Sequence, residues 1–274
     1  MPLLRPLLCL LLLTVSARSV EPAIEVEKGV WNGASVADVH AVLASAQQEI
    51  WKHCEGLAAP GVKVVFNKEY PITFDQRLPD GRVRIGLATG GTYWCQYSFQ
   101  YAHEYAHLLA GHVRPNGAWT GTGNANGWLE ESLCETASLF ALRAMAGTWR
   151  EAPPYPNWRD YSSALSDYAR DRLADPRHQL PAGVDFPRWF AEKQPELRRQ
   201  PCNREWNTLI AARLLPVFER DPAAWKTLAW FRHSQAGPQA ALEDHLAGWR
   251  AACPAELRPR VDAIAGVFRK PGAK

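Results

Sequence analysis

The sequence has no long apolar run beyond its first residues, which limits how the chain can meet a membrane. A membrane-spanning helix needs about 20 consecutive apolar residues. After residue 19, charged side chains interrupt every apolar segment of the 274-residue chain. We therefore expect no stable insertion into a membrane.

A strong charge of one sign is also missing. The 31 basic and 28 acidic residues leave a formal net charge of +3, and no basic stripe is clustered along the chain. Because nucleic-acid binders concentrate lysine and arginine on one face, the composition predicts no nucleic-acid partner. It leaves the oligomeric state open.

The one continuous apolar stretch lies at the N-terminus. Arg5 precedes an apolar run over residues 7–15, and small residues follow as far as Ser19. This order is typical of a cleaved secretory signal peptide. Residues 1–19 are therefore predicted to be removed, and the mature protein to be secreted or periplasmic. The alternative is that this segment forms the first helix of a cytosolic fold.

Cysteine is scarce, with 6 in the whole chain. Export to an oxidising compartment makes disulfides reasonable, but the cysteines after residue 19 are odd in number, so at least one thiol stays free. Cys134 lies in a strongly apolar helical segment and is expected to be a buried thiol. The predicted pairs are then Cys54 with Cys95 and Cys202 with Cys253.

Apolar periodicity divides the chain into a mixed first part and a helical second part. Residues 36–57 have helical spacing, and Ser35 is placed to cap their start. Residues 62–66 and 83–87 read as strands, and turn residues at 79–81 lead into the second. Further helices are predicted over residues 93–109, 128–146, 158–174, 187–198, 204–220, 222–233, 237–250 and 255–268. This order favours an α+β fold.

Residues 103–107 read H-E-Y-A-H and fit the pattern H-E-x-x-H. Two histidines four residues apart on a helix project from the same face, so His103 and His107 can bind one metal ion. Glu104 lies one step round the helix, where its carboxylate can take a proton from a water that the metal acidifies. The pattern predicts a hydrolytic Zn²⁺ site with Glu104 as general base.

The surroundings of the motif argue against an ordinary surface helix. Most side chains over residues 97–109 are apolar, so this helix is predicted to be buried on most of its circumference. Buried histidines and carboxylates need partners. A metal ion would satisfy both histidines at once.

A catalytic zinc usually has three protein ligands, so a third must lie outside the motif. His112 is close in sequence, but a ligand histidine of the extended pattern would fall one residue later. The next apolar helix carries three glutamates. Glu131 and Glu135 share one stripe, which suits a ligand and a carboxylate that braces a histidine. Glu130 is expected only to favour the helix N-terminus.

These two segments resemble the gluzincin metallopeptidases, the clan that includes thermolysin and the aminopeptidase N family. Residues 103–107 match the first motif of the clan, and W-L-E-E-S over residues 128–132 is similar to the aminopeptidase segment W-L-N-E-G. The resemblance implies that Glu131 is the third zinc ligand. It also implies that Glu135 stands where the clan keeps a carboxylate behind the ligands.

The resemblance further implies a zincin-like catalytic part over residues 20–150, with a small mixed sheet and a metal-binding helix, and a helical C-terminal part over residues 151–274. In this clan an edge strand pairs with the substrate, and residues 83–87 are the segment implied here. A Tyr or His from the helical half is expected to stabilise the transition state. The candidates are Tyr155, Tyr161, Tyr168, His178 and His233.

The expected function is that of a secreted zinc metallopeptidase acting on a peptide or protein substrate. The aminopeptidase signature G-x-M-E-N is replaced by other residues at positions 90–94, so cleavage at a free amino terminus and cleavage within a chain both stay open. The alternatives are a zinc hydrolase of a non-peptide amide or cell-wall material, and a non-catalytic binding protein that zinc stabilises.

Overall fold

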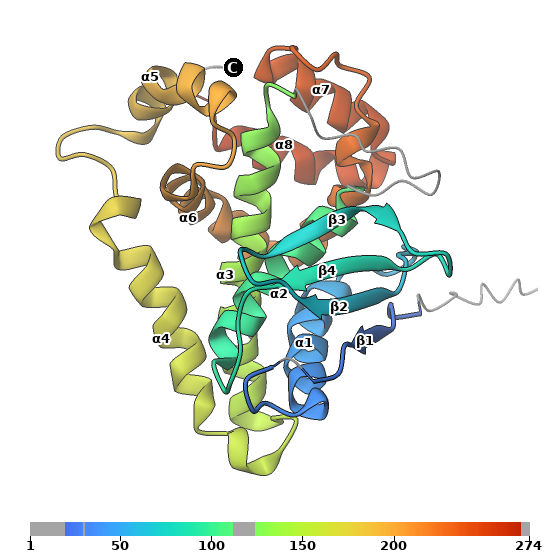
Figure 1. The fold of residues 1–274 in the computed structure, drawn as a ribbon. Helices are drawn as coiled ribbons and strands as arrows, with labels where there is room; N and C mark the ends of the chain where they lie inside the picture. Colours follow the sequence, from blue (N-terminus) through green and yellow to red (C-terminus); the bar gives the residue numbers. More distant parts are fainter. Residues whose placement is uncertain (1–19, 30, 112–123, 270–274) are drawn as a thin grey trace, which may run out of the picture.

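A small mixed sheet lies on one side of a larger set of helices in the computed structural model (Figure 1). The structure describes residues 20–29, 31–111 and 124–269, so the expected signal peptide and His112 lie outside it. The strands are β1 (Ile24–Val26), β2 (Val62–Phe66), β3 (Ile72–Arg77) and β4 (Val83–Leu87), in the spatial order β1-β2-β4-β3. Strands β1, β2 and β4 are parallel, and β3 is antiparallel to β4. The α+β class is confirmed.

The edge of the sheet next to the helix of His103 and His107 is β3, which corrects the sequence prediction. Residues 83–87 form a strand as expected, but this strand, β4, is interior and pairs on both sides. The turn at residues 79–81 closes a hairpin, with the Leu78 amide donating to the Arg82 carbonyl at 2.8 Å. Strand β3, which precedes that turn, was not predicted because its second half is polar and because its register with β4 shifts between Thr73 and Arg77.

Of the three helices in the first half, the first two pack on the sheet, and the second and third carry the motif residues. They are α1 (Val36–Trp51), α2 (Trp94–Leu109) and α3 (Gly127–Glu151). The Ser35 side chain accepts a hydrogen bond from the Asp38 amide at 3.0 Å, which confirms the predicted cap of α1. Helix α2 packs against α1, α3 and β4. Helix α3 continues past Gly147, where a stop had been expected.

The described part of the second half contains helices and no strand, as predicted. Its α-helices are α4 (Tyr161–Ala174), α5 (Phe186–Arg199), α6 (Arg204–Arg220), α7 (Leu242–Ala252) and α8 (Arg258–Gly266). Its 3-10 helices are η1 (Pro156–Trp158), η2 (Pro176–His178), η3 (Pro222–His233) and η4 (Ala255–Leu257). Helices α4 and α6 pack on α3, and Figure 1 shows α4 and the sheet on opposite sides of α3.

One continuous apolar core joins the two halves. Buried side chains of the sheet, of α1 to α3 and of the C-terminal helices belong to the same cluster. The division into two domains near residue 150 therefore stays a prediction. Among the described helices, none combines the length and apolar character that crossing a bilayer requires.

The predicted disulfides are wrong. The described cysteines are all free thiols: Cys54, Cys95, Cys134, Cys202 and Cys253. Cys95 Sγ lies 3.5 Å from the Tyr161 hydroxyl, and Cys202 Sγ lies 3.7 Å from a Glu131 carboxylate oxygen, so each has a partner other than cysteine. The prediction that Cys134 is buried is confirmed, with 1% of its surface exposed.

Gly86 of β4 provides a test of the sheet edge. A Cβ atom at this position would lie 2.9 Å from Asn67 Cβ and 3.1 Å from Ile72 Cγ2, closer than packing allows. We expect Gly86→Ala to destabilise the protein by about 1–3 kcal/mol through overpacking. Urea unfolding measures the change.

The matched control is Gly147→Ala. Nothing lies within 4 Å of a Cβ built at this position of α3. Alanine should therefore stabilise the helix by about 0.5–1 kcal/mol relative to glycine. If Gly86→Ala were as stable as wild type, β3 would not pack on β4 as described.

Candidate metal centre

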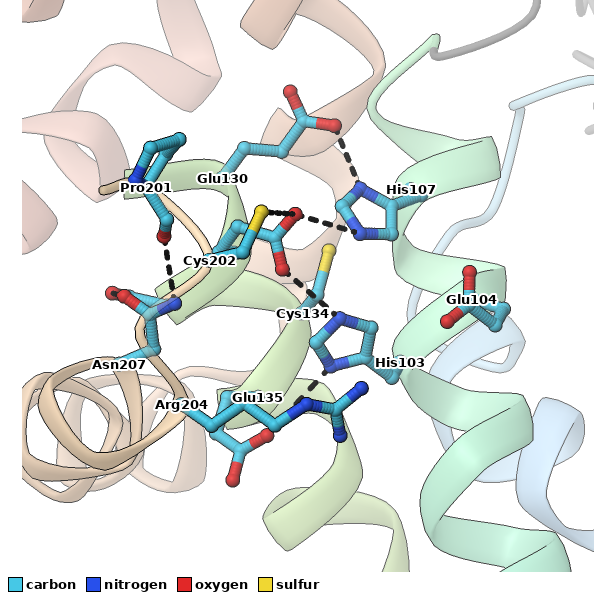
Figure 2. Close-up of polar contacts among 12 residues, drawn as sticks. His103, Glu104, His107, Glu130, Cys134, Glu135, Pro201, Cys202, Arg204 and Asn207 are labelled. Atoms are coloured by element: carbon cyan, nitrogen blue, oxygen red, sulfur yellow. Dashed lines mark hydrogen bonds and ion pairs between the residues drawn. The ribbon is translucent and has the colours of Figure 1, made fainter. Parts of the chain in front are cut away.

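His103 and His107 lie on the same face of α2 and point toward α3 (Figure 2). Their ring centroids are 5.1 Å apart, as the four-residue spacing on a helix requires. Both rings lie inside the protein, since 14% and 11% of the two side chains are exposed. The predicted pair is therefore together, and largely shielded from solvent.

The carboxylate of Glu131 on α3 faces both rings. Its Oε2 lies 3.3 Å from His103 Nε2, and its Oε1 lies 3.6 Å from His107 Nε2. Ligands of one tetrahedral zinc lie about 3.3–3.6 Å apart, given zinc bonds of about 2.0–2.3 Å. Each of these two distances fits a pair of ligands on one ion, and a different oxygen of Glu131 makes each contact.

The outer nitrogen of each ring faces another carboxylate of α3. His107 Nδ1 lies 2.8 Å from Glu130 Oε1, and His103 Nδ1 lies 3.7 Å from Glu135 Oε2. Partners at Nδ1 orient imidazoles and leave Nε2 free for a metal. The position predicted for Glu135 behind a histidine agrees with this arrangement. The expectation that Glu130 only favours the helix N-terminus is wrong, because Glu130 holds His107.

Arginines from the helical half neutralise these two outer carboxylates. Arg232 of η3 donates to Glu130 Oε1 at 2.6 Å, and Arg172 of α4 lies 2.6 Å from Glu135 Oε1. Glu131 has no lysine or arginine within ion-pair distance in the part of the chain that the structure describes. The negative charge of Glu131 can therefore be neutralised by the two histidines when they are protonated, or by a cation bound between them.

The electrostatics of this cluster favour a positive charge between the helices. Burial alone would lower the pKa of His103, but its contacts with Glu131 and Glu135 raise that pKa to about 10. Burial would likewise raise the pKa of Glu131, yet the charges of His107 and His103 lower it to about 2. A divalent cation would supply the same positive charge that these protons provide.

Cys134 adds a sulfur to the same place, which the sequence reasoning treated only as a buried thiol. Single donor atoms of His103, His107 and Cys134 all lie within 4.8 Å of one another. These three buried residues could hold a metal ion. The signal was present in the sequence, because Cys134 follows Glu131 by three residues and so shares its side of the helix.

Glu104 is held by the edge strand. Its side chain is buried, and the Thr73 hydroxyl of β3 lies 2.9 Å from both Glu104 Oε2 and the Glu104 carbonyl oxygen. Sequence reasoning missed Thr73, because β3 itself was not predicted. The strand therefore fixes the carboxylate that was predicted as the base.

Two cavities meet at the centre. One of about 560 Å³ lies along β3 and is lined by Thr73, Glu104, His103 and Arg204, among others. The other, of about 920 Å³, lies between α3 and α5. His107, Glu131 and Cys202 line both. A substrate could therefore reach the ligand group from either side.

The predicted transition-state donors lie elsewhere. None of the five candidates is among the described residues that line the two cavities: Tyr155, Tyr161, Tyr168, His178 and His233. The Tyr161 hydroxyl contacts Cys95, and His178 Nδ1 lies 2.6 Å from the Arg172 carbonyl oxygen. Arg204 is exposed and lines the cavity along β3.

Comparison of the chain with known protein families, with curated proteins and with solved structures finds no match.

The roles of the three glutamates can be ranked by zinc affinity. Glu131→Ala should reduce the affinity most, because it removes the carboxylate that faces both Nε2 atoms. Glu130→Ala and Glu135→Ala should each reduce it by about 10- to 100-fold, because each frees one imidazole from its partner at Nδ1. Competitive zinc titration of the folded variants measures all three.

Glu192→Ala, an exposed glutamate on α5, is the matched control and should bind zinc like wild type. If Glu130→Ala bound zinc as tightly as wild type, His107 would need no partner at Nδ1 to bind the ion. Wild-type affinity in all three variants would show that none of these glutamates is a ligand.

Proposed function

We propose that the chain is a zinc-dependent peptidase of the gluzincin type, with a zincin-like arrangement of the sheet and of α2 and α3. His103, His107 and Glu131 would hold the ion, and Glu104 would act as general base. The proposal is carried by one observation above all. Both Nε2 atoms face Glu131, which alone of the three glutamates at 130, 131 and 135 has no arginine or lysine partner among the described residues.

The donor set suits zinc. Two imidazole nitrogens and a carboxylate are the ligands of catalytic zinc in thermolysin-like enzymes, whereas magnesium and calcium prefer oxygen alone. When bound, zinc polarises a substrate carbonyl and makes water acidic enough to lose a proton near neutral pH. The protein would supply ligands of fixed orientation and a site shielded from solvent.

Glu104 is positioned to accept that proton. Its carboxylate lines the same cavity as His103 and Glu131, and it is not one of the groups whose oxygen faces the two Nε2 atoms. The Thr73 hydroxyl has one proton, which it can donate to Oε2 or to the Glu104 carbonyl oxygen, and donation to Oε2 leaves Oε1 to accept. After bond cleavage the same carboxyl group can return the proton to the leaving amine.

The position of β3 favours an extended peptide as substrate. An edge strand offers unpaired backbone groups that can pair with a further strand. Among the described strands β3 pairs only with β4, and six consecutive residues, Tyr70 to Asp75, line the cavity that holds Glu104. A peptide paired with β3 would therefore lie across the ligand group.

One observation favours a second candidate, a non-catalytic centre that joins α2 to α3. Structural zinc sites use cysteine and have four protein ligands, and Cys134 provides a fourth donor here. Such a site has no use for a base. The behaviour of Glu104 variants therefore separates the two functions.

Glu104→Gln should lower peptide hydrolysis by about 10²-fold or more, because it removes a proton acceptor without removing a ligand. Zinc content, measured by metal analysis, should stay at the wild-type value. Glu55→Gln, at an exposed position, is the control and should leave the activity unchanged. Stoichiometric zinc with no hydrolysis of any peptide in the wild type would favour the non-catalytic centre.

Thr73→Val should lower kcat by up to about 10²-fold, since a displaced carboxylate transfers protons poorly. The substitution keeps the shape of the side chain and removes the hydroxyl that holds Glu104. Thr73→Ser restores the hydroxyl and should recover most of the rate. If valine were as active as threonine, β3 would not position the base.

A further inference from the structure

The sulfur of Cys134 lies between the two histidine rings in Figure 2. We infer that Cys134 is a direct ligand of the ion, so that the donor set holds one sulfur beside two imidazole nitrogens and the oxygen of Glu131. This inference rests on the metal-binding part of the proposed function and is independent of hydrolysis.

The position of Cys134 is fixed by α3. The residue follows Glu131 by three positions, so both side chains leave the helix on the side that faces α2. Its donor atom and those of the two histidines lie within 4.8 Å of one another. Donors on one zinc ion lie about 3.3–3.6 Å apart, so small side-chain rotations would bring the sulfur into place.

Cys134 lies where the apolar core meets the charged groups of the centre. A buried free cysteine commonly acts as a small apolar side chain, and Cys134 does belong to the core cluster. Glu104, Glu130 and Glu131 nevertheless lie close enough to act on its thiol, and its sulfur makes no hydrogen bond within the described residues. A sulfur that lies beside two imidazoles and has no hydrogen-bond partner is well suited to bind a metal ion.

The sulfur would decide which ion the centre takes. Thiolate ligands favour zinc, cobalt and cadmium over magnesium, calcium and manganese. As the sulfur–metal bond forms, the thiol proton passes to solvent. Four protein donors leave a place for substrate only if the ion takes a fifth ligand, as catalytic zinc does during some reactions.

Cobalt(II) substituted for zinc tests the assignment, because a cobalt–thiolate bond gives an intense charge-transfer absorption that nitrogen and oxygen ligands do not give. Wild-type protein should show this absorption, and Cys134→Ser should lose it. Cys202→Ser is the matched control, since Cys202 is exposed, also lies beside Glu131, and should leave the absorption unchanged. Cys134→Ser should also lower zinc affinity by about 10-fold or more, as even indirect ligand contacts contribute that much.

X-ray absorption of the zinc-bound protein is a second measure. It should find one sulfur at about 2.3 Å from zinc in the wild type and none in Cys134→Ser, which separates Cys134 from the neighbouring Cys202. No sulfur near zinc in the wild type, or a cobalt absorption that survives in Cys134→Ser, overturns the inference. A protein that cleaves peptides without a sulfur ligand refutes this inference alone. A protein with the sulfur ligand but no hydrolysis refutes the peptidase alone.

Discussion

The burial of three carboxylates in one helix is the constraint on which the rest of the structure depends. Glu130 and Glu135 are almost fully buried on α3, and Glu131 is largely so. A buried charge without a partner costs several kcal/mol, so each glutamate requires a cation or a set of donors. An arginine of η3 pairs with Glu130, and an arginine of α4 pairs with Glu135. All three glutamates also face the histidines of α2. The helical half is thereby joined to the motif helix through charge as well as through the apolar core.

The sheet acts on the centre through a single strand. Strand β3 forms the wall of one cavity, and Thr73 connects that wall to Glu104. Gly86 on β4 lets β3 approach closely, because the space that a side chain would occupy there is filled by Asn67 and Ile72. The proposed base thus depends on the sheet, whereas the proposed ligands depend on the contact of α2 with α3. The centre lies where these two supports meet.

Local spacing made the core of this centre predictable from sequence. The four-residue repeat of His103 and His107 fixes their common face, and an apolar helix with glutamates indicates buried partners. The pairing of Glu130 with His107 was not predictable, because the arginine that neutralises Glu130 lies 102 residues away. Strand β3 was missed because its register shift breaks the alternation on which strand prediction depends. The predicted disulfides were wrong because the positions of cysteines along a sequence do not show which of them lie close together in the fold.

Glu104 and Cys134 place opposite demands on one metal ion. A base beside the ligands is useful only where substrate can bind, which requires an open coordination position, whereas a fourth protein donor closes the coordination of a tetrahedral ion. The two residues approach from different sides, since Glu104 is bonded to the edge strand and Cys134 belongs to α3. An ion that accepts five ligands during the reaction satisfies both demands. In such a centre the sulfur would hold the ion tightly, and the face lined by β3 would remain available for the peptide.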